Sequence, residues 1–165
     1  MPDTDSIPFV IADKKDYFKS EGVNVKIAHF TSARDRDSAL QSGKIDGAVS
    51  DVLAEAFITE SGSKMKIICA TSGSYKLVAS KKSRVKKLSD IKGKNVAISK
   101  NTLIEYSTDK ILETASLAPS DVQKLAIPQI PIRLEMLQNG KVDAAVLPEP
   151  MASLAILNGG VLISS

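Results

Sequence analysis

Leu40-Gln41-Ser42-Gly43-Lys44-Ile45-Asp46-Gly47-Ala48-Val49 returns 97 residues later as Leu137-Gln138-Asn139-Gly140-Lys141-Val142-Asp143-Ala144-Ala145-Val146, with seven of ten positions identical. In each copy a helix is expected to end at the glycine, which tolerates the left-handed conformation found just past helix ends. A short apolar strand follows, and then a polar tip: Ser50-Asp51 in the first copy, Pro148-Glu149-Pro150 in the second. The repeat predicts two α/β lobes of similar design, unless a common helix-to-strand turn has simply been used twice. Ligands bind beyond the carboxyl ends of strands in open α/β sheets, so two facing lobes predict a ligand cleft.

The composition is that of an ordinary soluble globular protein. The 165 residues are 43% hydrophobic and 25% charged, which allows one domain or two small lobes. Aromatic residues make up 4% and tryptophan is absent, which argues against a surface that stacks nucleobases. A net charge of +3 is too small to indicate nucleic acid as a partner.

The chain contains one cysteine, Cys69, so it forms no intrachain disulfide. Its apolar neighbours Ile67 and Ile68 predict that it is buried as a small hydrophobic side chain. The sequence shows no signal peptide and no apolar run of about 18 residues, the length that a membrane span requires. The sequence leaves open whether a signal or a lipid anchor was removed from a longer parent.

Helical and strand patterns alternate along the chain, which predicts parallel α/β sheets. The expected helices cover residues 7–18, 33–41, 52–59, 103–115, 132–138 and 151–157, with a single helical turn at 88–94. The expected strands cover residues 23–30, 45–49, 66–70, 75–80, 95–98, 124–127, 143–147 and 161–164.

We expect a first, incomplete lobe of residues 1–78 and 155–165 and a second lobe of residues 79–154. The last strand, 161–164, would lie back near the first lobe or beside residues 77–80. Two strands that cross between the lobes would form a hinge.

Five ordered stretches carry a family resemblance. They are Pro8–Ala12 with Tyr17-Phe18 and Gly22-Val23, Phe30–Ser32 with Asp35, Ser42–Ala48, Leu88–Ala97 and Asn139–Pro150. In this order the chain resembles the substrate-binding proteins of ABC importers of the nitrate/sulfonate/taurine type. The resemblance implies a two-lobed type II periplasmic-binding fold that clamps a small organic or anionic molecule and delivers it to a membrane permease. It also implies a periplasmic or extracytoplasmic location, with lipid anchoring of the full-length parent as one possibility.

The family pattern extends beyond both ends of this chain. Family members begin with a strand just before the loop that opens this sequence, and they continue well past residue 165. The resemblance therefore implies an excerpt whose first lobe lacks its central strand. Exposed strand edges attract another chain, so we expect a homodimer or strand exchange.

The candidate ligand-binding residues are polar side chains that follow strands or begin helices. Unpaired N–H groups and a partial positive charge at helix starts suit carboxylate, sulfonate or phosphate groups, although the same residue types also serve as ordinary helix caps. The candidates are Thr4, Asp5, Ser6, Thr31, Ser32, Ser50, Asp51, Thr71 and Ser72 in the first lobe, and Asn101, Thr102, Tyr106, Gln129 and Glu149 in the second.

The two carboxylates at the repeat tips carry a chemical hint. Asp51 and Glu149, if both lie in the cleft, would repel a purely anionic ligand and accept hydrogen bonds from an amine, amidine or aminopyrimidine. The sequence thus favours a nitrogen-bearing ligand.

No catalytic, metal or cofactor motif stands out. His29 is the only histidine and falls in a strand pattern, and no zinc-binding, nucleophile-elbow or phosphate-loop motif is present. We therefore expect a binding protein with no catalytic residues, metal or cofactor. Two alternatives stay open: the effector-sensing domain of a transcription regulator, and an enzyme similar to the thiamine-pyrimidine synthases.

Overall fold

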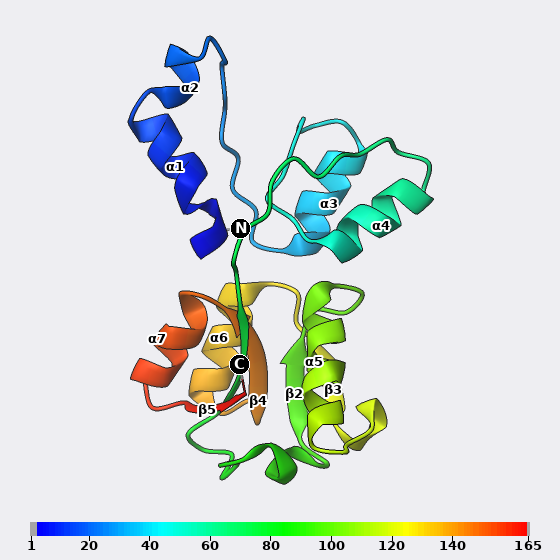
Figure 1. Ribbon diagram of the computed structural model, residues 1–165. Coiled ribbons are helices and arrows are strands. Elements are labelled where there is room, and N and C mark those ends of the chain that lie inside the picture. The colour runs from blue at the N-terminus through cyan, green and yellow to red at the C-terminus, as the bar shows by residue number, and fades with distance from the viewer. Residues whose placement is uncertain (1–2, 165) are drawn as a thin grey trace.

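The computed structural model describes residues 3–164, which form helix-rich and sheet-containing parts (Figure 1). The α-helices are α1 (Ile7–Lys14), α2 (Tyr17–Ser20), α3 (Ala33–Gln41), α4 (Val52–Glu60), α5 (Leu103–Thr114), α6 (Ile130–Asn139) and α7 (Met151–Leu157). The strands are β1 (Tyr75–Ala79), β2 (Asn95–Ile98), β3 (Gln123–Ala126), β4 (Ala144–Pro148) and β5 (Val161–Ser164). Short 3₁₀ helices are η1 (Thr4–Ser6), η2 (Leu88–Ile91) and η3 (Pro119–Asp121).

The five strands form one mixed sheet in the order β3-β2-β4-β1-β5. β2 runs parallel to β3 and β4, whereas β1 runs antiparallel to β4 and β5. The expected α/β class is confirmed, and so is the expected place of the last strand beside β1. β1 forms antiparallel pairs because it begins at the end of the sheet where its neighbour β4 finishes (Figure 1).

Helices cover both faces of this sheet. On one face α5 packs its Ile104 and Leu112 against Leu77, Ile98 and Val146. On the other face α6 and α7 pack against Val78, Ala97, Ala145 and Leu147, and every residue of β4 is buried. This three-layer unit, residues 75–164, is called the sheet lobe below.

Residues 3–74 form the N-terminal lobe, which holds α1 to α4. The strands expected at residues 23–30, 45–49 and 66–70 are wrong, because within residues 3–74 these segments form no strand and pair with no neighbouring strand. Alternating side chains favour a strand only where another backbone supplies ladder hydrogen bonds. Cys69 is exposed for the same reason, against the expectation of burial.

The helix expected at residues 7–18 is broken into α1 and α2. Asp16 takes a left-handed conformation with φ of 55°, which aspartate tolerates better than most residues. The repeat glycines behave as expected, because Gly43 and Gly140 adopt φ of 67° and 70° just past α3 and α6.

The boundary between moving lobes stays a prediction, and residues 1, 2 and 165 of the expected first lobe lie outside the described residues. The sheet contains β1 and β5 together with β2 to β4. Within residues 3–164 one segment, which leads into β1, connects the two lobes (Figure 1), and the two-strand hinge stays a prediction.

Candidate functional site

The carboxyl ends of β2, β3 and β4 lie at one edge of the sheet because these strands are parallel. β1 is antiparallel and therefore starts at this edge, with Tyr75 opposite Pro148. We call it the inter-lobe edge, since it faces the N-terminal lobe (Figure 1). A ligand is expected at such an edge.

Two backbone hydrogen bonds join the lobes here, and both involve predicted site residues. The N–H of Thr4 donates to the carbonyl oxygen of Glu149 over 3.4 Å, and the N–H of Ile130 donates to the carbonyl oxygen of Thr31 over 3.4 Å. Predicted residues from both halves of the sequence thus meet at the inter-lobe edge.

The candidates of the sheet lobe lie at the starts of its helices or one turn inside. Thr102 caps α5, where its Oγ1 accepts from the N–H of Ile104 and donates to the carbonyl oxygen of Ser99. Asn101 takes φ of 57°, and its N–H donates to Glu105. Gln129 is exposed and makes no side-chain cap for α6, whereas Tyr106 is half-exposed beneath the ammonium group of Lys110.

The candidates of the N-terminal lobe differ in their environment. Ser32 is buried and caps α3 by accepting from the N–H of Asp35 at 3.2 Å. Ser6 bonds with Asp3 within η1, and Asp5 packs so closely on Gly73 that a Cβ there would collide with its carboxylate. The remaining three are exposed: Ser50, Thr71 and Ser72.

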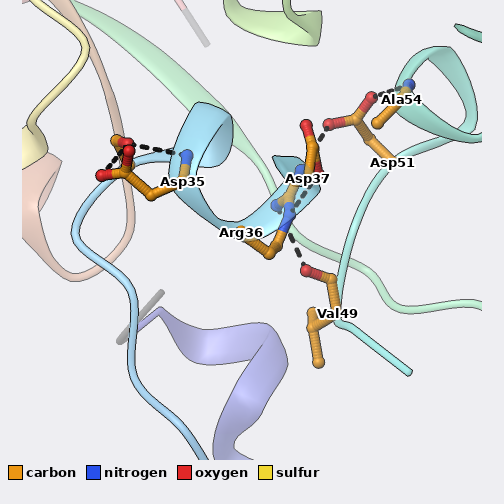
Figure 2. A network of polar contacts seen from close by, with 7 residues as sticks. Asp35, Arg36, Asp37, Val49, Asp51 and Ala54 are labelled. Carbon is orange, nitrogen blue, oxygen red and sulfur yellow. Dashed lines mark hydrogen bonds and ion pairs between the residues drawn. The ribbon is translucent and has the colours of Figure 1, made fainter. Parts of the chain in front are cut away.

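Each tip carboxylate has a cationic neighbour. Asp51 caps α4 by accepting from the N–H of Ala54 at 2.9 Å, and its Oδ2 lies 3.8 Å from Nη2 of Arg36 (Figure 2). Glu149 forms an ion pair with Lys76 and accepts from the N–H of Ser153 at 3.1 Å. The hydrogen bond from Lys76 lowers the pKa of the Glu149 carboxyl. These partners weaken the argument from sequence for a nitrogen-bearing ligand.

Sequence reasoning missed two buried arginines. The Arg133 side chain is fully buried, and its guanidinium donates to three backbone carbonyls, those of Ile127, Pro128 and Val146. Burial lowers the pKa of Arg133 to about 10, so it remains a cation at neutral pH. The Arg36 side chain is also buried, and it contacts Asp37 and the carbonyl oxygen of Val49 (Figure 2).

Tyr75 was also missed as a site residue. Burial, followed by the negative charge of Asp51, raises the pKa of its hydroxyl to about 12, and the charges of Asp3 and Asp5 act in the same direction. The hydroxyl therefore stays protonated at neutral pH and is able to donate a hydrogen bond.

A pocket lies elsewhere, between α1 and the segment of residues 24–29. It measures about 560 Å³ and is lined by His29, Val10 and Lys14 among others, but by none of the predicted site residues. Among residues 3–164 no cluster of three or more His, Cys, Asp or Glu side chains is placed to hold a metal. Within that same range, no helix has both the length and the apolar character to cross a membrane.

The Glu149–Lys76 pair predicts a pH-dependent stability. A carboxyl whose pKa is lowered by folding stabilises the protein above its unfolded pKa, near 4.5, and this contribution is lost as the pH falls through the lower folded pKa. We expect Glu149→Gln to reduce the free energy of unfolding at pH 7 by about 0.5–1 kcal/mol. The difference should disappear near pH 2–3.

Urea unfolding followed by circular dichroism at both pH values measures this difference. Glu113→Gln is the matched control, because Glu113 pairs with Lys110 on the exposed surface and should contribute little. An equal loss for Glu149→Gln at both pH values would contradict the prediction.

Comparison with known proteins gives the chain a family. The family model described as NMT1/THI5 like matches residues 3–152. A search of the curated proteins finds no match.

Several solved structures with a similar fold are solute-binding proteins. The alkanesulfonate-binding protein SsuA from Xanthomonas axonopodis pv. citri, bound to MOPS, has a TM-score of 0.77 at 20% identity, with 94% of this chain and 56% of that chain covered. The periplasmic aliphatic sulphonate-binding protein SsuA from Escherichia coli has a TM-score of 0.77 at 22% identity, with 97% and 57% covered.

A substrate-binding protein of an amino acid ABC transporter from Streptococcus pneumoniae, bound to L-arginine, has a TM-score of 0.63 at 20% identity, with 93% and 62% covered. This chain therefore spans little more than half the length of the two SsuA proteins. The similarity assigns it the α/β fold of the two-lobed periplasmic binding proteins, and the family match over residues 3–152 shows that the chain belongs to the NMT1/THI5-like family.

Proposed function

We propose that this chain is the solute-binding part of an ABC importer. The observation that carries the proposal is the meeting of both lobes at the inter-lobe edge, where Thr4 bonds to Glu149 and Ile130 bonds to Thr31. Solved proteins with this fold bind small solutes. A solute held between the lobes would shift an open–closed equilibrium toward the closed state.

The site chemistry supports binding over catalysis. His29, the one histidine, lines a cavity that contains none of the predicted site residues. The polar groups at the inter-lobe edge include hydrogen-bond donors and acceptors: the Tyr75 hydroxyl, the Glu149 carboxylate and the Thr102 cap of α5. The solved structures of this fold named above are binding proteins.

The proposal includes a membrane permease as the partner and a location outside the cytoplasm. Fractionation of cells that express the parent gene tests the location.

A homodimer is a separate proposal. It draws support from Ile68, which is 89% exposed in a segment without a strand partner. Light scattering measures the mass of the chain in solution and so tests for the homodimer.

A thermal-shift screen tests solute binding directly. The probes are short alkanesulfonates, carboxylates, amino acids and aminopyrimidines, with sodium chloride at equal ionic strength as the control. A solute that binds only the folded chain at 100 times its Kd adds about 2.7 kcal/mol of stability, so we expect the Tm to rise by several degrees and to depend on concentration. A flat response to every probe class, alongside a cooperative melt, would contradict the proposed function.

A further inference from the structure

Arg36 and Arg133 occupy equivalent positions of the internal repeat. They lie 97 residues apart, the same offset that relates Gly43 to Gly140. Nη1 of Arg36 donates to the carbonyl oxygen of Val49 at 3.2 Å, and Nη1 of Arg133 donates to that of Val146 at 2.8 Å. Val49 and Val146 are themselves repeat equivalents. The repeat therefore includes a buried arginine that holds the end of the segment after the glycine.

The two arginines differ in their other N–H groups. In Arg133, Nε and Nη2 donate to the carbonyl oxygen of Ile127 at 2.9 and 2.8 Å, and Nη2 also reaches that of Pro128 at 3.4 Å. By the same offset, the counterparts of Ile127 and Pro128 are Phe30 and Thr31. The carbonyl oxygen of Thr31 instead accepts from Ile130 of the sheet lobe.

Arg36 is consequently left with an unused donor. Its Nε donates to Asp37 at 2.8 Å, while its Nη2 is buried and has no hydrogen-bond partner among residues 3–164. The whole residue is 5% exposed. A buried cationic donor without an acceptor is costly, so a native protein retains one only where something compensates for it.

Arg36 has one carboxylate near Nη2 and acts electrostatically on one residue of the inter-lobe edge. Asp51, the cap of α4, places its Oδ2 3.8 Å from Nη2, too far for a hydrogen bond (Figure 2). The charges of both Arg36 and Asp51 act on the Tyr75 hydroxyl, which begins β1 at this edge. The donor thus lies 3.8 Å from the carboxylate that begins a nine-residue helix, and its charge acts on a protonated phenol at the inter-lobe edge.

We propose that Nη2 of Arg36 binds an oxyanion group of the solute, a sulfonate or carboxylate oxygen, and that Asp51 limits the strength of this contact. The inference rests on the proposed function. Guanidinium groups recognise such oxygens with charge-assisted hydrogen bonds. Asp51 lies 3.8 Å from the donor and would repel an oxyanion bound there, so removal of its charge should strengthen binding.

The test measures the affinity of propane-1-sulfonate and of propionate by isothermal titration calorimetry. For Arg36→Gln we expect a loss of about tenfold or more, because a charge-assisted hydrogen bond and a cation are both removed. Arg36→Lys should retain part of the affinity, since the charge remains without the fork. Arg34→Gln is the matched control, an exposed arginine on the same helix, and should stay within about twofold.

Asp51→Asn separates oxyanion binding from amine binding. Asparagine caps a helix as well as aspartate does, so the fold is kept while the charge is lost. If an oxyanion binds Arg36, Asp51→Asn should bind the solute more tightly by about threefold to tenfold. If instead an amine of the solute binds Asp51, Asp51→Asn should bind it more weakly. Circular dichroism melts of all variants establish that each one is folded.

The outcomes are distinct. Wild-type affinity in a folded Arg36→Gln or Arg36→Lys chain, or weaker binding by Asp51→Asn, overturns the assignment of Arg36. Binding of an aminopyrimidine but of neither oxyanion overturns it as well and leaves the solute-binding function intact. A chain that binds none of the solutes in the thermal-shift screen contradicts the proposed function itself, and the assignment of Arg36 fails with it.

Discussion

Arg133→Met is expected to lower the free energy of unfolding by about 3–5 kcal/mol, a large part of the stability of a domain of this size. The Arg133 side chain has no exposed surface, and its guanidinium is bonded to the carbonyl oxygens of Ile127, Val146 and, more weakly, Pro128. Methionine fills much of the volume but leaves these buried acceptors without donors, and each unsatisfied group costs about 1–3 kcal/mol. Because Ile127 follows β3 and Val146 lies in β4, the inter-lobe edge should loosen together with the sheet.

Urea unfolding followed by circular dichroism measures the loss for Arg133→Met. Arg34→Met is the control, since it removes the same side chain from an exposed position and should change stability by about 0.5 kcal/mol or less. A change below about 1 kcal/mol for Arg133→Met would show that the carbonyl groups find other donors. If Arg133→Met does not fold, Arg133→Lys, which retains one donor group, is expected to fold with a Tm below that of the unchanged chain.

Leu77→Ala is expected to lower the free energy of unfolding by about 2–5 kcal/mol. Leu77 is fully buried in β1, pairs with Val146 and Ser164 on its two sides, and packs in the cluster that α5 covers. Removal of its side chain leaves a cavity that the paired strands cannot close, and the lost contacts add to the lost burial.

Leu157→Ala removes the same atoms from the end of α7, where Leu157 is 83% exposed, and should be close to neutral. Both variants are measured by thermal and urea unfolding. Similar small losses for the two variants would mean that β1 contributes little to the folded sheet, and that residues 75–79 act as a linker between lobes.

The elements that depend on local sequence were predicted well. The spans of α3, α7, β2 and β5 agree with the expectation at both ends, because a cap or a glycine marks each helix and apolar runs mark the strands. Gly43 and Gly140 take the left-handed conformation that the repeat required. The strands of the N-terminal lobe were not predicted correctly, since a strand also needs a partner that no local pattern supplies.

The candidate site was predictable in part. Thr4, Thr31 and Glu149 lie at the contact between lobes, and Thr102 caps a helix at the same edge. The part played by every one of these candidates in binding stays a prediction. Arg36 and Arg133 were overlooked because arginine is usually exposed. The one signal available was their spacing of 97 residues, the offset of the repeat.

The sequence by itself determined the α/β class, the helix–glycine–strand repeat and the polar tips that follow it, because helix ends, left-handed glycines and apolar runs depend on neighbouring residues. Only the tertiary structure decided which strands pair, which charges meet and which donors stay unused. Burial gives Arg133 three backbone acceptors and leaves Nη2 of Arg36 without one. Such differences arise from the packing of segments far apart in the chain, where the free energy of a polar group depends on whether water or a partner surrounds it.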